Sequence, residues 1–386
     1  MEKKGKVLFV RTPPYDVNPN TYNMQQVGIG RAFCDKGYDY DFITFKKRDP
    51  KEWVFYEKDG CVGRYIEKPR LRLLRWGINT SLCDPAFLKQ YDLIICQEYY
   101  QLQTYLMSRR TDRLAVYSGP YYNMFMPKCL SPIYDALFAK KLSANVRRIF
   151  VKSILAKEYL EKKGYTGIQN VGVAIDTSRY ADVKIAPETQ KLADYMRENR
   201  CLLYVGALSS RKNYPFLLEV YRAALKIYPD LKLVTIGAGK ASAMQKLMGK
   251  KDSYYPGHFD ARLTDAERSG ITHIKSMDNA QLKFIYPMAK VFLLPSLKEI
   301  FGMVLLEALY FGAPTVSSRN GGSLTLMPDE RYGQIVEPFD VALWVKAIRR
   351  YMDDEAYARS VIDAARGRIE SDFVWDRIVD QFMTAM

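Results

Sequence analysis

Short apolar runs alternate along the first half of the chain with segments in which apolar residues recur every three or four positions. The runs predict buried strands, and the longer spacing predicts helices between them. Alternating strands and helices are typical of a parallel sheet, so the pattern predicts an α/β fold. The strands are expected at residues 7–10, 40–45, 93–96, 114–117 and 148–151, and the helices at 26–36 and 154–163.

A polar stretch from Thr177 to Arg200 separates this series from a second one. The second series predicts strands at 201–205, 231–236, 271–274, 291–294 and 314–316, and helices at 215–227 and 279–289. Residues 341–386 are predicted to be helical throughout, with Trp344 and Trp375 as packing anchors. Because 386 residues exceed one ordinary core, we predict two domains, residues 1–184 and 185–371, with a boundary near residue 185.

Two glutamates flank the most informative segment of the second series. The strand at 291–294 leads into Glu299, and a helical pattern that begins near Gly302 carries Glu307. Open parallel sheets bind ligands at such strand-to-helix turns, and free N–H groups at a helix start favour phosphate. Carboxylates beside a phosphate suit sugar or ribose hydroxyls, so the segment predicts a nucleotide-sugar site. The ordinary alternative is a pair of helix-start carboxylates.

Four segments of the second half resemble a known family. They are residues 205–213, residues 234–239, the pair Glu299 and Glu307, and residues 312–317 followed by Gly321 and Gly322. Together they resemble the retaining glycosyltransferases of family 4, which have the GT-B architecture. Order and spacing fit across about residues 200–340, whereas the first half matches only in its strand-helix rhythm. The resemblance implies two Rossmann-like domains facing a cleft, with a last helix, at about 372–386, that crosses back onto the first domain.

The resemblance also implies roles for individual residues. Lys212 and Arg211 would neutralise the departing nucleoside diphosphate, a stabilisation commonly worth roughly 3–4 kcal/mol per donor; their ordinary alternative is a solvated pair at a helix start. Glu299 would bond the hydroxyls of the donor sugar and Glu307 the ribose diol. Donor binding is further implied for the N–H groups of Gly302, Met303, Val304 and Leu305, the close-approach glycines Gly237 and Gly239, and Ile274 beside the base, although strand core explains Ile274 nearly as well.

By the same resemblance, the anomeric configuration is retained and no metal is essential. The donor is a nucleoside-diphosphate sugar, with UDP favoured, and it acts as a co-substrate; no cofactor is expected. The donor would bind mainly to the second domain and the acceptor to the first. Two departures concern the donor site: Ala207 stands where the family often has arginine, and Lys275 where it has glycine.

A third departure concerns the first domain, where many family members carry a histidine near the reacting sugar. This chain has only His258 and His273, both in the second half, and Ser118 begins the equivalent turn. A base is less critical if the leaving phosphate itself accepts the acceptor's proton. Glu98 is another candidate, although a surface loop residue is the ordinary explanation.

Two other motifs of the first domain are candidates for ligand sites. Residues 13–21 replace the usual glycine pair of the phosphate loop, and Asn20 can cap the next helix toward the ligand. Asp39 and Asp41 form a D-x-D motif, but side-chain alternation along a strand explains them better. No metal site is therefore predicted.

The charge of the chain is +15, and its excess lies in the first half. Residues 1–180 hold 30 Lys and Arg against 18 Asp and Glu, a net of +12. Basic and apolar residues are mixed at 64–76, which suits an anionic membrane surface or a lipid-linked acceptor; a solvated basic surface is the alternative. The six cysteines show no metal-type pairing, and no apolar run is long enough for a signal peptide or a membrane span. A cytoplasmic protein, peripheral on the inner face of the membrane, is expected.

The leading prediction is a retaining hexosyltransferase that moves a sugar from a nucleotide sugar to a glycan or lipid-linked acceptor in cell-surface polysaccharide biosynthesis. A sugar-nucleotide epimerase or a phosphorylase is an alternative on the same architecture, but an epimerase is expected to need acid and base groups that are scarce here. A non-catalytic nucleic-acid or glycan binder is the third possibility. Such a binder has no need of Lys212, Glu299 and Glu307 together, so no nucleic-acid partner is expected.

Overall fold

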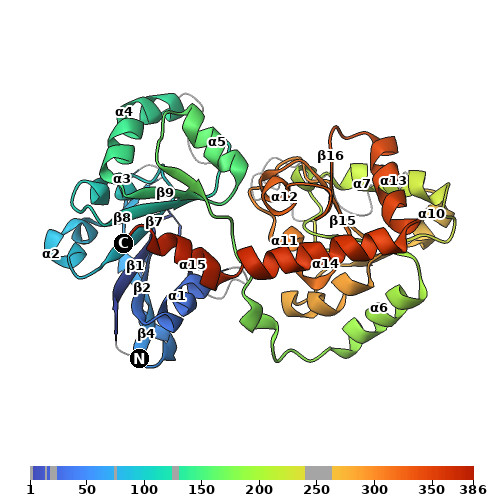
Figure 1. Ribbon diagram of the computed structural model, residues 1–386, viewed down its shortest axis with the longest axis horizontal. Helices are drawn as coiled ribbons and strands as arrows, with labels where there is room; N and C mark the ends of the chain where they lie inside the picture. The colour runs from blue at the N-terminus through green and yellow to red at the C-terminus, as the bar shows by residue number, and fades with distance from the viewer. Residues whose placement is uncertain (1–2, 14, 18–23, 74–75, 124–129, 240–262) are drawn as a thin grey trace. The chain divides into compact units, whose positions relative to one another are not determined.

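The structure is a computed structural model that describes residues 3–13, 15–17, 24–73, 76–123, 130–239 and 263–386 (Figure 1). The chain forms two compact units. Unit 1 comprises Met1–Asp176 and Asp372–Met386, and unit 2 comprises Thr177–Ser371. The units therefore divide between Asp176 and Thr177, against the boundary predicted near residue 185, and the chain passes from one unit to the other twice.

Unit 1 contains a sheet with the strand order β10-β9-β8-β7-β1-β2-β4-β3. All neighbouring pairs are parallel except β3 and β4, which are antiparallel. A short antiparallel pair, β5 with β6, lies apart from this sheet. The strands are β1 Gly5–Arg11, β2 Tyr38–Lys46, β3 Glu52–Lys58, β4 Cys61–Pro69, β5 Leu71–Leu73, β6 Trp76–Ile78, β7 Leu93–Gln97, β8 Leu114–Ser118, β9 Arg148–Val151 and β10 Ile168–Asn170.

The helices of unit 1, apart from the C-terminal one, connect these strands, as predicted for an α/β fold. They are α1 Gln25–Asp35, the short α2 Pro85–Leu88, α3 Leu102–Ser108, α4 Leu130–Asn145, α5 Ile154–Lys162 and the C-terminal α15 Trp375–Met383, with a 3-10 turn at Thr80–Cys83. Local signals set their ends: the Ser153 hydroxyl caps α5 by accepting from the Ala156 N–H, and Gly37, with φ +94°, follows α1.

The C-terminal helix α15 packs on α1 within unit 1. Its buried face consists of Trp375, Ile378, Val379 and Phe382. The Trp375 indole lies so close to Gly28 of α1 that a Cβ there would come within 2.2 Å of the indole nitrogen. The Lys36 ammonium adds ion pairs of 2.7 Å to Asp376 and 2.8 Å to Asp380. Residues near the C-terminus therefore complete the first unit of the chain.

Residues 52–69, for which the sequence predicted no strand, form β3 and β4. Strand β4 includes the first part of the basic segment 64–76. The Arg64 guanidinium donates at 2.8 and 2.9 Å to Asp41, Arg70 pairs with Asp16, and the Trp76 indole donates to the Tyr100 carbonyl at 2.9 Å. Arg64, Arg70 and Trp76 thus have partners within unit 1, whereas Leu71 is exposed and residues 74–75 lie outside the described residues. A membrane contact of the segment stays a prediction.

Unit 2 contains a fully parallel sheet with the strand order β13-β12-β11-β14-β15-β16. The strands are β11 Cys201–Val205, β12 Lys232–Ile236, β13 Ile271–Ile274, β14 Val291–Leu294, β15 Thr315–Ser318 and β16 Gln334–Val336. The helices are α6 Pro187–Glu198, α7 Tyr214–Leu225, α10 Asp265–Ser269, α11 Met303–Phe311, α12 Gly321–Leu326, α13 Val341–Met352 and α14 Glu355–Asp372. Short 3-10 turns lie at Thr177–Tyr180, Ser210–Lys212, Asn279–Phe284 and Tyr286–Met288.

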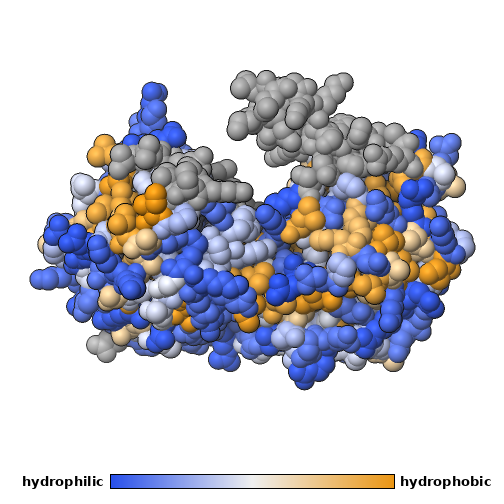
Figure 2. Space-filling model, turned by 90° about the horizontal axis from the view of Figure 1, so that it is seen from above, coloured by the Kyte–Doolittle hydropathy of each residue, from blue (hydrophilic) through white to orange (hydrophobic). Residues whose placement is uncertain are grey.

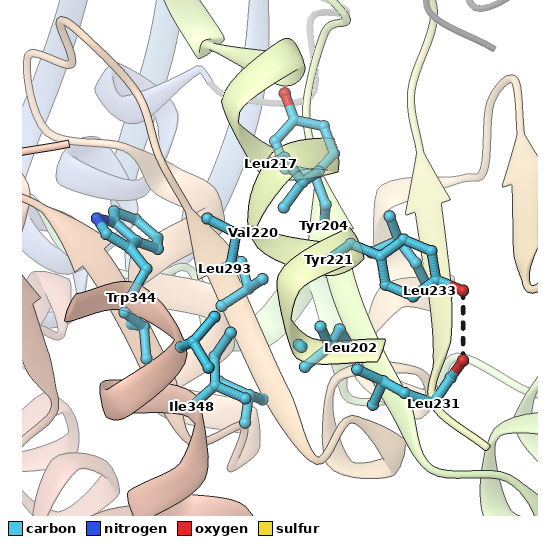
Figure 3. Packing of buried hydrophobic residues seen from close by; sticks show 14 of the residues in the cluster. Leu202, Tyr204, Leu217, Val220, Tyr221, Leu231, Leu233, Leu293, Trp344 and Ile348 are labelled. Atoms are coloured by element: carbon cyan, nitrogen blue, oxygen red, sulfur yellow. Dashed lines mark hydrogen bonds between the residues drawn. The ribbon is translucent and has the colours of Figure 1, made fainter. Parts of the chain in front are cut away.

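The core of unit 2 lies between its sheet and helices α7 and α13 (Figure 3). Leu202 and Leu293 come from neighbouring strands, and Val220 and Ile348 from the two helices. Trp344 is fully buried, as predicted for a packing anchor. The Tyr221 hydroxyl donates to the Leu231 carbonyl at 3.3 Å, which satisfies a polar group inside the core.

The prediction of a helix at 279–289 is wrong. The structure has two 3-10 turns there, at Asn279–Phe284 and Tyr286–Met288. Pro287 has no N–H and its ring obstructs a continuing α-helix, so the segment breaks at this point.

Figure 2 shows hydrophilic residues over much of the visible surface, with apolar patches between them. Large apolar side chains that are exposed include Leu71, Ile133 and Leu137. Across the described ranges, no helix is both long and apolar enough to traverse a bilayer.

Candidate active site

The sequence-predicted donor residues of unit 2 gather where the strand order of its sheet reverses. Strand β11 lies between β12 and β14, so the connections leave β11 and β14 in opposite directions along the sheet. Ligands of open α/β sheets bind beyond the carboxyl ends of the strands at this switch point. The loops after β11 and β14 carry Arg211, Lys212 and Glu299.

Lys212 and Glu299 form an ion pair although 87 positions separate them. Only 8% of the Lys212 side chain and 12% of the Glu299 side chain is exposed. The Arg211 guanidinium also contacts Glu299, at 3.2 Å, and donates to the Lys298 carbonyl at 2.9 Å. Two cations thus surround one carboxylate, which leaves a positive excess at the switch point.

Backbone contacts hold the loop of Glu299 in place. The Leu297 N–H donates to the Arg211 carbonyl at 2.9 Å, and the Gly321 N–H donates to the Glu299 carbonyl at 3.2 Å. Gly302 adopts φ +78°, and a Cβ at this position would lie 2.9 Å from Glu299 Cγ. Glycine is therefore required at the start of α11 for both conformation and space.

The N-terminus of α11 opens directly after this loop. The Leu305 N–H already donates to the Gly302 carbonyl at 2.9 Å. The N–H groups of Met303 and Val304 meet no acceptor in the part of the chain that the structure describes. An anion is favoured here by the free N–H donors, by the positive end of the helix dipole and by the two nearby cations. Phosphate is the common ligand of such a site.

Glu307 lies inside α11 with 1% of its surface exposed. Its carboxylate accepts from Asn279 Nδ2 at 3.1 and 3.2 Å and from the Tyr286 hydroxyl at 3.1 Å. The Tyr180 hydroxyl in turn donates to Asn279 Oδ1 at 3.0 Å. These three residues were not predicted as part of the site, because the pattern placed Asn279 and Tyr286 in a helix and Tyr180 in a polar stretch.

Three more predicted residues lie along the same edge of the unit 2 sheet. Gly237 follows β12 with φ +148°, and a Cβ there would lie 2.0 Å from the Gly206 carbonyl oxygen. Its N–H donates at 2.9 Å to the carbonyl of Ile274, the last residue of β13. Gly239 also follows β12. The loops after β11, β12 and β13 are thus tied together by main-chain contacts.

The predicted residues of unit 1 form a separate cluster. The Ser118 hydroxyl donates to Glu98 Oε2 at 2.8 Å, and the Gly119 N–H donates to the same oxygen at 3.2 Å. Glu98 is 8% exposed, so the alternative of a surface loop residue is wrong. Asn20 lies outside the described residues.

The carboxylates of the D-x-D motif have cationic partners. Asp39 pairs with Lys3 at 2.8 Å, and Asp41 pairs with Lys6 at 2.9 Å and with Arg64. Among the residues that the structure describes, no three His, Cys, Asp or Glu side chains are grouped as ligands for a metal ion.

A comparison with models of protein families matches residues 195–368, which lie in unit 2 and contain its whole sheet, to the family described as glycosyl transferases group 1. This stretch is therefore similar to group 1 glycosyltransferases. Among curated proteins, the glycogen synthase of Mycobacterium tuberculosis is 30% identical over 177 residues, which cover 46% of this chain and 40% of that protein. The chain thus spans less than half the length of this relative.

Solved structures extend the similarity to the whole fold. The E. coli trehalose-6-phosphate protein bound with UDP-2-fluoro glucose superposes with a TM-score of 0.73 at 14% identity, over 98% of each chain. An Anabaena protein, HepE, in complex with UDP and glucose gives a TM-score of 0.66 at 15% identity, also over 98% of each chain. The fold is therefore GT-B, with one Rossmann-like sheet in each unit.

Proposed function

We propose that the protein is a retaining, metal-independent glycosyltransferase that moves a sugar from a nucleoside-diphosphate sugar to a glycan or lipid-linked acceptor. One observation carries the proposal: Lys212, Arg211 and Glu299 meet at the switch point beside the free N–H groups of α11. A site that only binds phosphate does not need a carboxylate held between two cations. A site that binds both a diphosphate and a sugar does.

In this mechanism the donor diphosphate lies at the N-terminus of α11, close to Lys212 and Arg211. The bond between the anomeric carbon and the phosphate oxygen breaks, and a bond from the anomeric carbon to the acceptor oxygen forms on the same face of the sugar. The acceptor's proton passes to the leaving phosphate. Lys212 and Arg211 neutralise the charge that develops on that phosphate, a role that otherwise falls to a divalent ion.

Glu299 changes partner in the proposed reaction. In the structure its carboxylate is bonded to Lys212 and Arg211. When the diphosphate attracts these cations, the Glu299 carboxylate becomes available to the hydroxyls of the donor sugar. The ion pair therefore keeps both side chains in place before the donor binds.

Glu307 is proposed to bond the ribose diol. Asn279 and Tyr286 hold its carboxylate in one orientation and use three of roughly four acceptor positions. Gly237 and Gly239 allow close approach to the donor, and Ile274 frames the base. UDP is the favoured nucleotide, since both compared structures hold UDP or a UDP-sugar.

The basic excess of residues 1–180 favours an anionic partner for unit 1. We therefore propose a cytoplasmic enzyme, peripheral on the inner face of the membrane, in the synthesis of a cell-surface polysaccharide. Co-sedimentation with vesicles of phosphatidylglycerol and phosphatidylcholine tests the membrane part. Equal sedimentation with phosphatidylcholine alone would remove it.

The central test is donor binding and turnover with purified protein. Ligand-observed NMR with UDP-, GDP-, ADP-, CMP- and dTDP-sugars in EDTA identifies the donor, and release of the nucleoside diphosphate measures turnover with water or a sugar acceptor. We expect binding of one nucleotide family without metal and an α-linked product from an α-linked donor.

Lys212→Ala is expected to lower turnover by about 10²–10³-fold. Lys226→Ala serves as the matched control, since Lys226 is exposed at the opposite end of α7. Equal turnover of Lys212→Ala and Lys226→Ala would overturn the site assignment. An inverted product would overturn retention alone.

A further inference from the structure

Unit 1 has a switch point of its own. Strand β1 lies between β7 and β2, and β7, β8 and β9 continue the sheet on the other side of β1. The carboxyl ends of these parallel strands share one edge of the sheet. Along this edge, Arg11 ends β1, Glu98 follows β7, Ser118 ends β8 and Lys152 follows β9.

Lys152 is a buried lysine at this edge of the sheet. Only 8% of the residue is exposed. Its N–H donates to the Ser118 carbonyl at 3.0 Å, and its ammonium lies 4.8 Å from the centre of the Tyr117 ring. It makes no ion pair with any residue that the structure describes. Burial lowers the pKa of Lys152, and Arg11 lowers it further while Glu98 opposes the shift.

Arg11 is the second cation of this edge. Its one side-chain hydrogen bond within the described ranges is a weak one, from Nη1 to the Met24 sulfur at 3.8 Å. It makes no ion pair with a described carboxylate either. Lys152 is buried and Arg11 is half-buried. Because a buried charge is costly unless it is paired, the pair of cations indicates that a bound ligand supplies the counterion.

In the order of the strands, Glu98 after β7 lies between Lys152 after β9 and Arg11 at the end of β1. Its backbone adopts φ +72°, which is strained for a residue with a side chain, and the Thr104 hydroxyl fixes its carbonyl at 3.1 Å. Ser118 and Gly119 hold Oε2. The other oxygen, Oε1, meets the Gln97 amide only at 3.5 Å. The strained backbone thus presents a carboxylate that is fixed on one side and able to accept a hydrogen bond on the other.

We propose that this edge of unit 1 binds an acceptor that carries a phosphate, with the phosphate on Lys152 and Arg11 and a hydroxyl of the acceptor on Glu98. The proposal rests on the proposed transfer reaction and names the chemical class of its acceptor. Two cations against one carboxylate leave a net positive charge, which a phosphate compensates. Because the carboxylate is an acceptor only, the guest must also supply a donor, and a phosphorylated sugar or polyol supplies both.

Binding of glucose 6-phosphate, inorganic phosphate and glucose to the full chain tests this site. Saturating UDP is present throughout, so that the phosphate-binding loop of unit 2 is occupied. We expect glucose 6-phosphate and inorganic phosphate to bind and glucose to bind at least tenfold more weakly. Lys152→Met and Arg11→Met are each expected to weaken glucose 6-phosphate at least tenfold. Lys157→Met is the matched control, because Lys157 is 41% exposed on α5.

Two readouts separate this role from a structural one. Lys152→Met without ligand is expected to have an equal or higher Tm, since it removes a buried charge that lacks a partner. Glu98→Gln removes a negative charge, so inorganic phosphate is expected to bind more tightly, while glucose 6-phosphate gains less because its hydroxyl loses the carboxylate acceptor. Unchanged glucose 6-phosphate affinity in Lys152→Met and Arg11→Met would overturn the proposal, as would a lower Tm of Lys152→Met with intact binding.

A further arm identifies the source of the phosphate. Phosphatidylcholine vesicles with 10% polyprenyl phosphate are compared with phosphatidylcholine alone, in wild type and in Lys152→Met. If only one of glucose 6-phosphate and polyprenyl phosphate binds more weakly to Lys152→Met than to wild type, that ligand identifies the acceptor class. If Lys152→Met weakens the binding of neither, the proposal is overturned. Failure of the two proposals is distinguishable: phosphate binding without any transfer would refute only the function, and transfer unaffected by Lys152→Met would refute only the acceptor site.

Discussion

The Lys212 ammonium and the Glu299 carboxylate form an ion pair that joins the loops after two neighbouring strands, β11 and β14. Both side chains are nearly buried, and Arg211 adds a second cation from the exposed side. Removing one partner of such a pair leaves an uncompensated charge, whereas removing both can be almost neutral.

This relationship predicts a specific stability pattern for a double-mutant cycle. Glu299→Gln is expected to lower the free energy of unfolding by about 1–3 kcal/mol, because Lys212 loses its buried counter-charge. The double variant Glu299→Gln with Lys212→Met is expected to recover part of this loss. Urea unfolding of wild type, both single variants and the double variant measures it. Strictly additive losses would show that the pair is not energetically coupled.

Gly237→Ala is expected to destabilise unit 2 by about 2 kcal/mol or more. A Cβ at Gly237 meets the Gly206 carbonyl oxygen at 2.0 Å, and both are backbone positions that cannot rotate away. Gly60→Ala is the matched control, since Gly60 also has positive φ, +81°, but open space around it. Thermal unfolding should rank Gly237→Ala well below Gly60→Ala. The opposite ranking would mean that the loops after β11 and β12 separate easily.

Gly28→Ala is expected to loosen α15 from α1 and to lower the Tm. The added methyl group would overlap the Trp375 indole, which has to move. Gly367→Ala within α14 is the control, because nothing lies within 4 Å of its Cβ and alanine favours a helix by about 1 kcal/mol. Differential scanning calorimetry should show a loss for the first variant and a small gain for the second. A gain in both would contradict the close packing of Trp375.

Buried thiols predict a stability loss at high pH. Burial, with neighbouring groups, raises the pKa of Cys34 from 9.0 to about 12, and burial raises that of Cys201 to about 11. Since the folded pKa exceeds the unfolded value, this stability is fully present below pH 9 and is lost as the pH rises through 11 and 12. At pH 8, Cys34 and Cys201 should react with iodoacetamide only after unfolding in urea. Labelling of either in the native protein, read by mass spectrometry, would contradict their burial.

The predictions from sequence are accurate where one local signal determines the limits of a strand or helix. The strand at 291–294 has the predicted limits, and the helix after Gly302 begins at Met303. The pairing of Glu299 with Lys212 could not be derived from spacing, because it depends on which strands are neighbours. The burial of Glu98 was missed for the same reason: its partners Ser118 and Gly119 lie at the end of a different strand.

The errors also have local causes. The run at 279–289 has helical spacing, but Pro287 divides it into two 3-10 turns. Within the segment 64–76, the sequence did not reveal the carboxylate partners of Arg64 and Arg70, because Asp41 and Asp16 lie far away along the chain. Charge partners contributed by other strands cannot be read from composition.

The return of α15 to unit 1 has a consequence for how the protein is made. Unit 2 is one continuous stretch, so it can fold as soon as residue 371 has left the ribosome. Unit 1 lacks Trp375, Ile378, Val379 and Phe382 until the ribosome has passed the whole of unit 2. The half of the chain that is synthesised first is therefore completed last, and until then a newly made chain exposes the apolar surface of α1 that α15 later covers.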